Sequence, residues 1–202
     1  MNEQGNIVGN VYDKYGTRNP VARYLMQGFL DTVAKLYLET KASSVLEVGC
    51  GEGSLANYLI QNAHRPNRMY ACDLSLDRVR EDIDPFIKMR EASIYELPYQ
   101  DKSFDLVICC EVLEHLENPD KGLNELARVA RNHVILSTPR EPIWRLLNMA
   151  RGKYLRNLGN TPGHIQHFSK SELIHLANTN LSMKKVLTPL PWTILLGTPN
   201  TQ

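Results

Sequence analysis

Three glycines at alternate positions, Gly49, Gly51 and Gly53, follow a short apolar run, 45–48, that contains one acid. The run has the composition of a buried strand, and the apolar residues after the glycines recur at helical spacing. Glycines at a strand-to-helix turn permit a sharp bend and let a ligand lie against the backbone. Because Glu47 precedes the turn, a cationic ligand is favoured there over a phosphate. The alternative is a tight connection without a ligand.

The second predicted strand, 69–73, ends in Asp73, about 20 residues after the glycine turn, as in nucleotide-binding sheets. An open α/β sheet binds ligands at the carboxyl ends of its strands, and a carboxylate there can accept two hydrogen bonds from a ribose diol. On local chemistry alone, Asp73 serves equally well as a cap for the segment that follows. Together with the glycine turn, ribose binding is favoured.

A dense group of ionisable residues follows the fourth predicted strand, 104–110. If a helix begins near Glu111, that residue shares one helical face with Glu114 and His115. Three interpretations are open. The residues can be structural or solvated, His115 can act as a general base, or the group can bind a divalent metal, for which carboxylate and imidazole are suitable ligands.

These residues have to be positioned by a sheet. Strand and helix patterns alternate from about residue 44 to 137, which predicts an α/β Rossmann-like doubly wound sheet, mostly parallel, with helices on both faces. An amphipathic helix covers 21–36, and two final runs, 183–187 and 192–196, are expected to pair as a hairpin. The remaining elements are a helix at 54–62, a short polar helix at 76–82, strands at 87–92 and 134–137, and helices at 120–130 and 169–177, the last with a capping box.

The bulk properties limit the class of protein. With 202 residues, 43% hydrophobic and 22% charged, we expect one domain, 1–202, with an N-terminal arm and helix at 1–40 and a cap at 140–168. The net charge of +1 argues against a general nucleic-acid binder. The four cysteines form no CxxC pair and are interpreted as core residues in a reducing cytosol. We see neither a signal peptide nor a transmembrane segment and expect a cytoplasmic protein.

The segment 140–158 carries five basic residues against one acid, interleaved with apolar side chains. Such a segment can lie on a membrane surface, bind an anionic substrate, cover an acceptor pocket or present a solvated face. We favour a pocket cover, because an insertion after the fifth strand lies above the ligand cleft. An anionic or lipid-like acceptor follows from its charge. The basic residues are Arg140, Arg145, Arg151, Lys153 and Arg156.

Taken together, these motifs resemble those of class I S-adenosylmethionine (AdoMet)-dependent methyltransferases, of the ubiquinone/menaquinone type (methyltransferase domain type 11). Residues 45–53 match that family's motif I, hydrophobic-hydrophobic-Asp/Glu-hydrophobic-Gly-x-Gly-x-Gly, and 97–105 match its Leu-Pro-Phe/Tyr to Ser-Phe-Asp stretch. The resemblance extends over about 43–137 and implies a seven-stranded sheet whose last strand is antiparallel. The residues assigned to AdoMet are Glu47, Gly49, Cys50, Gly51, Gly53, Asp73, Leu74, Ser93, Ile94 and Cys110.

Two details of the resemblance bear on the chemistry. Ser93 stands where many members have an Asp that binds the adenine amino group; its hydroxyl can still accept that bond, with Ile94 packing beside it, or it is a loop residue. The Glu-x-x-Glu-His spacing resembles metal-dependent small-RNA 2′-O-methyltransferases and the ubiquinone-pathway O-methyltransferase, although Val-Leu-Glu-His also occurs in members without a metal. The implied metal ligands are Glu111, Glu114, His115 and His164.

The expected function is transfer of a methyl group from AdoMet to a small-molecule acceptor, by O- or C-methylation. The protein then mainly has to orient the reactants and exclude water, with His115, His164 or His167 as base for a hydroxyl acceptor. The alternatives are a metal-assisted RNA 2′-O-methyltransferase, whose binding falls steeply with salt, and a non-catalytic AdoMet-binding protein. A Rossmann oxidoreductase is disfavoured by the glycine spacing. Tyr12 and Tyr15 on the arm are expected either to close over AdoMet or to pack.

Overall fold

The computed structural model describes residues 19–200. Its strands are β1 (Ser44–Val48), β2 (Arg68–Asp73), β3 (Ile87–Glu91), β4 (Phe104–Cys110), β5 (Ala130–Pro139), β6 (Leu181–Leu187) and β7 (Trp192–Pro199). Its α-helices are α1 (Pro20–Thr40), α2 (Ser54–Asn62), α3 (Pro119–Val129), α4 (Ile143–Ala150) and α5 (Lys170–Asn178). Two short 3₁₀ helices are η1 (Leu113–His115) and η2 (Leu155–Asn157). The arm that carries Tyr12 and Tyr15 lies outside the described residues.

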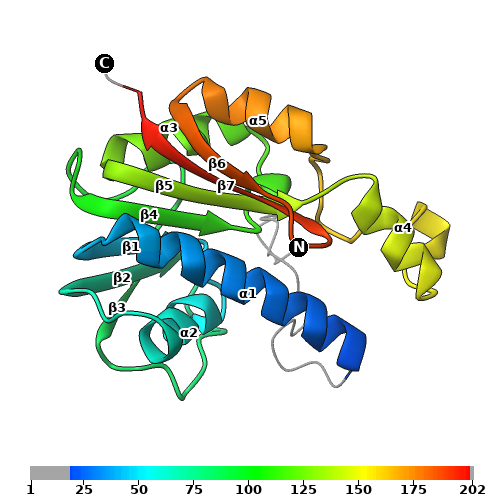
Figure 1. The fold of residues 1–202 in the computed structure, drawn as a ribbon, viewed down its shortest axis with the longest axis horizontal. Helices are drawn as coiled ribbons and strands as arrows, with labels where there is room; N and C mark the ends of the chain where they lie inside the picture. The colour runs from blue at the N-terminus through cyan, green and yellow to red at the C-terminus, as the bar shows by residue number, and fades with distance from the viewer. Residues whose placement is uncertain (1–18, 201–202) are drawn as a thin grey trace.

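The seven strands form one sheet in the order β3-β2-β1-β4-β5-β7-β6 (Figure 1). β7 runs antiparallel to β5 and β6, and the pairs among β1 to β5 are parallel. This confirms the predicted doubly wound, mostly parallel sheet with an antiparallel last strand, and the predicted terminal hairpin. β1, α2 and β4 begin and end where the sequence predicts, whereas β5 is longer than expected.

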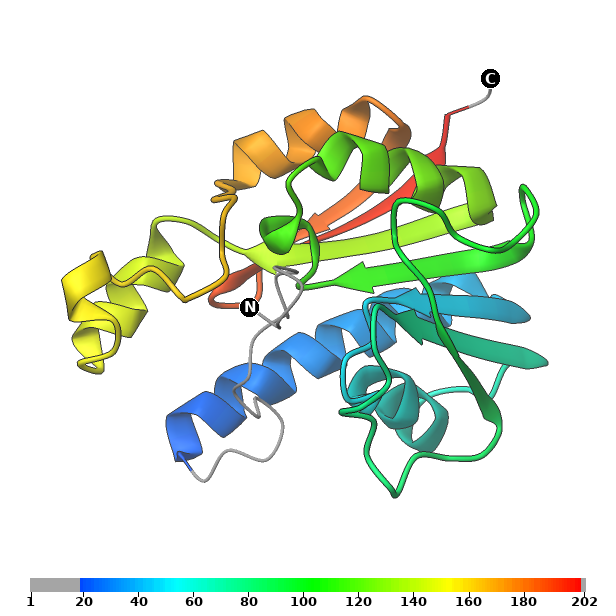
Figure 2. The same cartoon turned by 180° about the vertical axis from the view of Figure 1, so that it is seen from behind.

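The central strands are buried on both faces. Helices α1 and α2 cover one face of the sheet, and α3 and α5 cover the other (Figures 1 and 2). Along β4, Leu106 and Ile108 belong to the core under α1 and α2, while Val107 and Cys109 belong to the core under α3 and α5. A strand covered on both sides has no solvent face, and for this reason its sequence is apolar without alternation.

The strand order reverses between β1 and β4, the two neighbours from which the sheet extends in opposite directions. In a doubly wound sheet, ligands bind at this switch point, outside the carboxyl ends of the strands. Helix α4 stands beyond that edge, apart from the sheet (Figures 1 and 2). Within the described part of the chain, none of the helices combines the length and apolar character needed to cross a bilayer.

The prediction of a polar helix at 76–82 is wrong, because that segment forms turns. Polar side chains on either side of the segment bind the backbone locally: Ser75 Oγ accepts the Asp77 N–H at 3.1 Å, and Asp84 Oδ1 accepts the Phe86 N–H at 2.9 Å. Such bonds compete with helix formation. The capping box predicted at the start of α5 is confirmed, with reciprocal bonds between Ser169 and Glu172.

Candidate functional site

The glycine turn connects β1 to α2 with a backbone that only glycine adopts easily. Gly49, Gly51 and Gly53 have φ values of 75°, 53° and 77°. A Cβ on Gly49 would lie 2.2 Å from a methyl carbon of Val112, so this residue, the second after the end of β4, packs directly on the turn. A Cβ on Gly51 would meet nothing within 4 Å. The turn is therefore closely packed at its first glycine and open at its second.

Asp73, at the end of β2, holds the open part of the turn. Its Oδ2 accepts the Gly51 N–H at 2.8 Å, and its Oδ1 accepts the Leu74 N–H at 2.8 Å. The second bond is the local capping that the sequence offered as an alternative to ribose binding. Each carboxylate oxygen has a further lone pair, so the capping bonds leave acceptor capacity at the sheet edge. Leu74 is 60% exposed beside it, an apolar side chain at the same edge.

Glu47 does not face the mouth of the turn. It is 4% exposed and accepts the N–H of Ala56, in the first turn of α2, at 2.9 Å. A carboxyl at a helix N-terminus satisfies a donor that has no partner within the helix. Burial raises the pKa of Glu47 to about 8, an effect that the Ala56 bond opposes and that the charge of Asp73 reinforces. Glu47 thus has a structural role in the turn, and its role toward a cationic ligand stays a prediction.

The other residues predicted to bind the cofactor make local contacts or are at least half-buried. Ser93 Oγ accepts the Tyr95 N–H at 3.2 Å, as in an ordinary loop turn. Ile94 is 7% exposed and packs in the core beside Gly122. Cys50 is buried, Cys110 is half-buried, and burial raises the pKa of both thiols, which keeps them neutral. Whether these residues contact a ligand stays a prediction.

The helix expected to begin near Glu111 is not formed. Glu111 has a left-handed φ of 62°, and only the 3₁₀ turn Leu113–His115 follows. The carboxylate of Glu111 accepts the Trp192 Nε1–H at 2.8 Å and the Ser137 hydroxyl at 3.4 Å. The prediction that it shares a helical face with the next two ionisable residues is therefore wrong, because the strand ends in a tight turn that directs its side chain toward β5 and β7.

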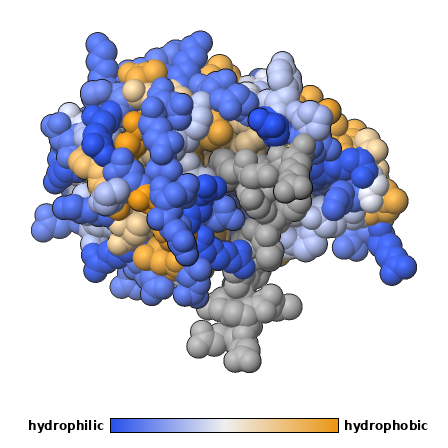
Figure 3. Space-filling model, turned by 90° about the horizontal axis from the view of Figure 1, so that it is seen from below, coloured by the Kyte–Doolittle hydropathy of each residue, from blue (hydrophilic) through white to orange (hydrophobic). Residues whose placement is uncertain are grey.

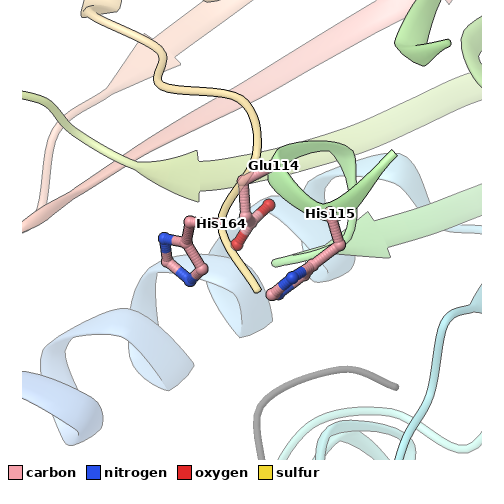
Figure 4. Close-up of side chains that lie close together, drawn as sticks. All are labelled: Glu114, His115 and His164. Atoms are coloured by element: carbon pink, nitrogen blue, oxygen red, sulfur yellow. The ribbon is translucent and has the colours of Figure 1, made fainter. Parts of the chain in front are cut away.

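Glu114, His115 and His164 form a compact cluster (Figure 4). One ligand atom from each residue lies within 4.8 Å of the other two, and the imidazoles meet edge to face with centroids 4.9 Å apart. Glu114 and His164 are buried, 1% and 4% exposed. Of the four predicted metal ligands, the fold thus brings three together, and Glu111 is not part of this group.

Backbone hydrogen bonds assemble this cluster from two distant segments. The carbonyl of Glu114 accepts the N–H groups of Ile165 and Gln166, both at 3.0 Å. His115 Nδ1 lies 2.8 Å from the carbonyl oxygen of Gly163. Since a carbonyl only accepts, Nδ1 carries the proton of this bond, and Nε2 is the basic nitrogen of the neutral ring. The segment before α5 is thereby fastened onto η1.

His167 lies outside the cluster. It is exposed, and its Nε2 is 2.9 Å from Oδ1 of Asn160. Two aromatic residues beside the cluster were not expected from the sequence patterns: Trp144 of α4 stacks on His164 with centroids 6.1 Å apart, and the ring of Trp192 lies 5.8 Å from that of Trp144. One signal could have found them, since they are the only two tryptophans of the chain.

Comparisons with known proteins place this site in context. A family model described as "Methyltransferase domain" matches residues 46–137. A probable S-adenosylmethionine-dependent methyltransferase of Mycobacterium tuberculosis is 35% identical over 48% of this chain and 36% of that protein. The ubiquinone biosynthesis O-methyltransferase of Rickettsia bellii is 26% identical over 86% of this chain and 75% of that protein.

Among solved structures, that of magnesium protoporphyrin IX methyltransferase from Synechocystis, with bound SAH, has a TM-score of 0.66. It is 20% identical and covers 96% of this chain and 91% of that one, which shows the likeness of the two folds. The chain spans about half or less of the first curated relatives that it matches, 56% of one and 36% of another.

Proposed function

Because the chain belongs to the class I S-adenosylmethionine-dependent methyltransferases, we propose that it transfers a methyl group from AdoMet to a hydroxyl oxygen of a small-molecule acceptor. One observation carries the proposal. Val112 packs on the glycine turn, and Glu114 and His115, which form a cluster with His164, are the second and third residues after Val112. A site for the cofactor and a group of proton acceptors therefore adjoin at one edge of the sheet.

The residues at the turn fit AdoMet. The open backbone at Gly51 and the exposed Leu74 offer room and an apolar contact, and Asp73 offers a carboxylate for a ribose diol. When bound, AdoMet supplies an electrophilic methyl group, whose bonding pair goes to the sulfonium sulfur as the acceptor oxygen bonds to carbon. The chain then has to hold the acceptor in line and exclude water.

His115 is our candidate for the base. Its Nδ1 is held by the Gly163 carbonyl, so Nε2 can take the proton of the acceptor hydroxyl. The carboxyl of Glu114 lies in the same cluster and, when ionised, stabilises the imidazolium that forms. The similarity to an O-methyltransferase of ubiquinone biosynthesis supports oxygen as the acceptor atom. Trp144, stacked on His164, supplies an apolar wall beside the cluster.

Two measurements test the proposal in order. A thermal-shift panel should show stabilisation by AdoMet and S-adenosylhomocysteine and none by NAD or NADP. AdoMet with a tritiated methyl group, incubated with fractionated extracts, should then label hydroxylated small molecules. Label on carbon acceptors alone would correct the acceptor atom, and stabilisation by NAD alone would reject the family-based function.

A divalent metal at the cluster is a second candidate. It is favoured because one ligand atom from each of the three residues lies within 4.8 Å of the other two. One carboxylate and two imidazoles suit an intermediate metal, which would lower the pKa of an acceptor hydroxyl. Metal analysis of the purified protein, with activity measured before and after chelation, distinguishes a metal-assisted reaction from one in which His115 acts as the base. Loss of activity that Mn²⁺ or Zn²⁺ restores would favour the metal. Full activity after chelation would leave His115 as the base.

The labelling assay with tritiated AdoMet also tests the alternative that the acceptor is RNA. If the label enters RNA and not small molecules, and binding weakens steeply with salt, the acceptor class is RNA.

A further inference from the structure

Helix α4 and η2 form a projecting segment, residues 143–158, which we call the α4–η2 tip. Its burial differs from that of a helix whose apolar face is packed on a core. Of the eight residues of α4, the one that is buried is Asn148, 2% exposed. Leu146 is 55% exposed, and in the following turns Leu155 and Leu158 are 58% and 65% exposed. The tip keeps a polar residue inside and presents leucines to solvent.

Hydrogen bonds hold the tip in this form. Asn148 Nδ2 donates to the Gly159 carbonyl at 2.8 Å and to Thr161 Oγ1 at 3.2 Å. Arg145 Nε donates to the Leu158 carbonyl at 2.9 Å, and a Cβ on Gly159 would lie 2.2 Å from the Arg145 carbonyl oxygen. The two sides of the tip are therefore in close contact, and the exposed leucines sit on a defined structure.

The tip is also strongly basic. It carries Arg145, Arg151, Lys153 and Arg156 and no acid, in a chain whose net charge is +1. None of these four residues is in an ion pair with a residue of the described range 19–200. In the space-filling view, apolar side chains gather at the end of the molecule that α4 occupies, next to hydrophilic ones (Figure 3). Apolar and cationic groups thus share one surface.

We propose that the α4–η2 tip docks on an anionic lipid surface. Exposed leucines beside a set of basic residues match an interface in which acyl chains lie next to negative headgroups. A nucleic acid offers phosphates and no apolar phase for three leucines. A second copy of the tip would bring four positive charges against four. Since Trp144 of α4 stacks on His164, docking would bring the cluster of the proposed active site close to the lipid surface.

The test uses the full chain without AdoMet or acceptor, so its result does not depend on methyl transfer. The protein is sedimented with vesicles of phosphatidylcholine alone and of phosphatidylcholine with phosphatidylglycerol, at low and high salt. We expect binding only to the anionic vesicles. The triple variant Arg151→Gln/Lys153→Gln/Arg156→Gln should bind them roughly 100-fold more weakly, since each basic residue near such a surface adds to the affinity. Leu155→Ser/Leu158→Ser should lose affinity by about as much.

Matched controls separate the tip from general effects. Leu38→Ser changes a leucine in the last turn of α1 that is 49% exposed, and Lys35→Gln/Lys170→Gln/Lys184→Gln removes three exposed lysines outside the tip. Both should bind like the unmodified chain, and all variants should melt at similar temperatures.

Four results would overturn the proposal. The first is the absence of binding to anionic vesicles at low salt. The second is unchanged binding of the double leucine variant, and the third is tighter binding of RNA than of vesicles; either would indicate a purely electrostatic surface. The fourth is dimerisation that the leucine variant abolishes without any vesicle binding, which would assign the tip to a second copy of the chain.

Discussion

The two halves of the proposed site are built in different ways. The cofactor half consists of consecutive elements, β1, the glycine turn, α2 and β2, and its central bond joins Gly51 to Asp73, 22 residues apart. The acceptor half joins Glu114 and His115 to His164, and the His115 to Gly163 contact spans 48 residues. In the first, local backbone geometry positions the ligand groups. In the second, a returning segment has to be fastened onto η1.

This difference has a functional consequence. The side-chain bonds of the cofactor half start from residues of the sheet: Glu47 of β1 accepts the Ala56 N–H of α2, and Asp73 of β2 accepts the Gly51 N–H. The acceptor half is attached by a few backbone bonds at 163–166, and its outer boundary is a projecting tip. We therefore expect changes in the returning segment and the tip to disturb the sheet less than changes in the cofactor half. If the two halves act separately, substitutions in one should leave the other intact.

The largest expected effect is on catalysis. His115→Ala should lower kcat by about 10²- to 10⁴-fold, because the acceptor hydroxyl loses its base. Glu114→Gln should lower kcat by a smaller factor, because the imidazolium loses its charged neighbour, and the Kd for AdoMet should stay unchanged in both variants. His167→Ala should have little effect, since that side chain faces Asn160, and His175→Ala on α5 is the matched control. Single-turnover labelling and calorimetry separate the two quantities. A His115→Ala protein that no longer binds AdoMet would show that the halves are not separable.

The next largest effect is on cofactor affinity. Asp73→Ala should raise the Kd for AdoMet by roughly 10- to 100-fold, because a charge-assisted bond is worth about 1.5–3 kcal/mol. Asp73→Asn keeps an acceptor oxygen but loses the charge, so its Kd for AdoMet should lie between those of the unmodified protein and Asp73→Ala. Asp77→Ala, an exposed acid in the following turn, is the control. Calorimetric titration with S-adenosylhomocysteine gives the affinities. Unchanged binding by Asp73→Ala would leave Asp73 as a cap for the turn.

A smaller effect concerns stability and pH in the cofactor half. Burial raises the pKa of Glu47 to about 8, whereas an unfolded glutamate titrates at about 4.3. The folded state therefore holds the proton more tightly, and the free energy of unfolding should fall as pH rises between these values. The expected loss is about 2 kcal/mol between about pH 5.5 and about pH 7. Urea unfolding across this range measures it.

Glu47→Gln keeps an acceptor for the Ala56 N–H and cannot titrate, so this part of the pH dependence should disappear in the variant. Glu96→Gln, at an exposed position, should retain it. A pH profile that is identical in Glu47→Gln and the unmodified protein would mean that another group causes the slope.

The smallest effect compares two glycines of one turn. Gly49→Ala suffers both a positive φ and a methyl clash with Val112, while Gly51→Ala suffers only the positive φ. We expect Gly49→Ala to be less stable than Gly51→Ala by about 1–2 kcal/mol in urea unfolding. For AdoMet affinity the order should reverse, because the added methyl of Gly51→Ala enters the open space. Equal affinities would indicate that no ligand approaches Gly51.

Much of the fold could be predicted because its signals are local. β1, α2 and β4 follow from apolar runs and glycines, and the α5 capping box follows from Ser169 and Glu172. The helix predicted at 76–82 is absent; the segment forms turns, and the flanking Ser75 and Asp84 accept backbone N–H groups two residues further on. The helix predicted at Glu111 failed because the chain turns sharply there, with a left-handed residue that no glycine marks.

By itself, the sequence determined the sheet and the cofactor half. The carboxyl ends of parallel strands meet at one edge of the sheet. The residues just after each strand are therefore neighbours, regardless of the conformation of the connecting loops. The family resemblance implied that His164 joins Glu111, Glu114 and His115, and the tertiary structure decided which of these ionisable residues meet. It joined His164 to Glu114 and His115, turned Glu111 toward Trp192 and left His167 outside. The contacts that fasten the returning segment are mostly made by backbone groups, and because every residue type carries such groups, no side-chain pattern records them.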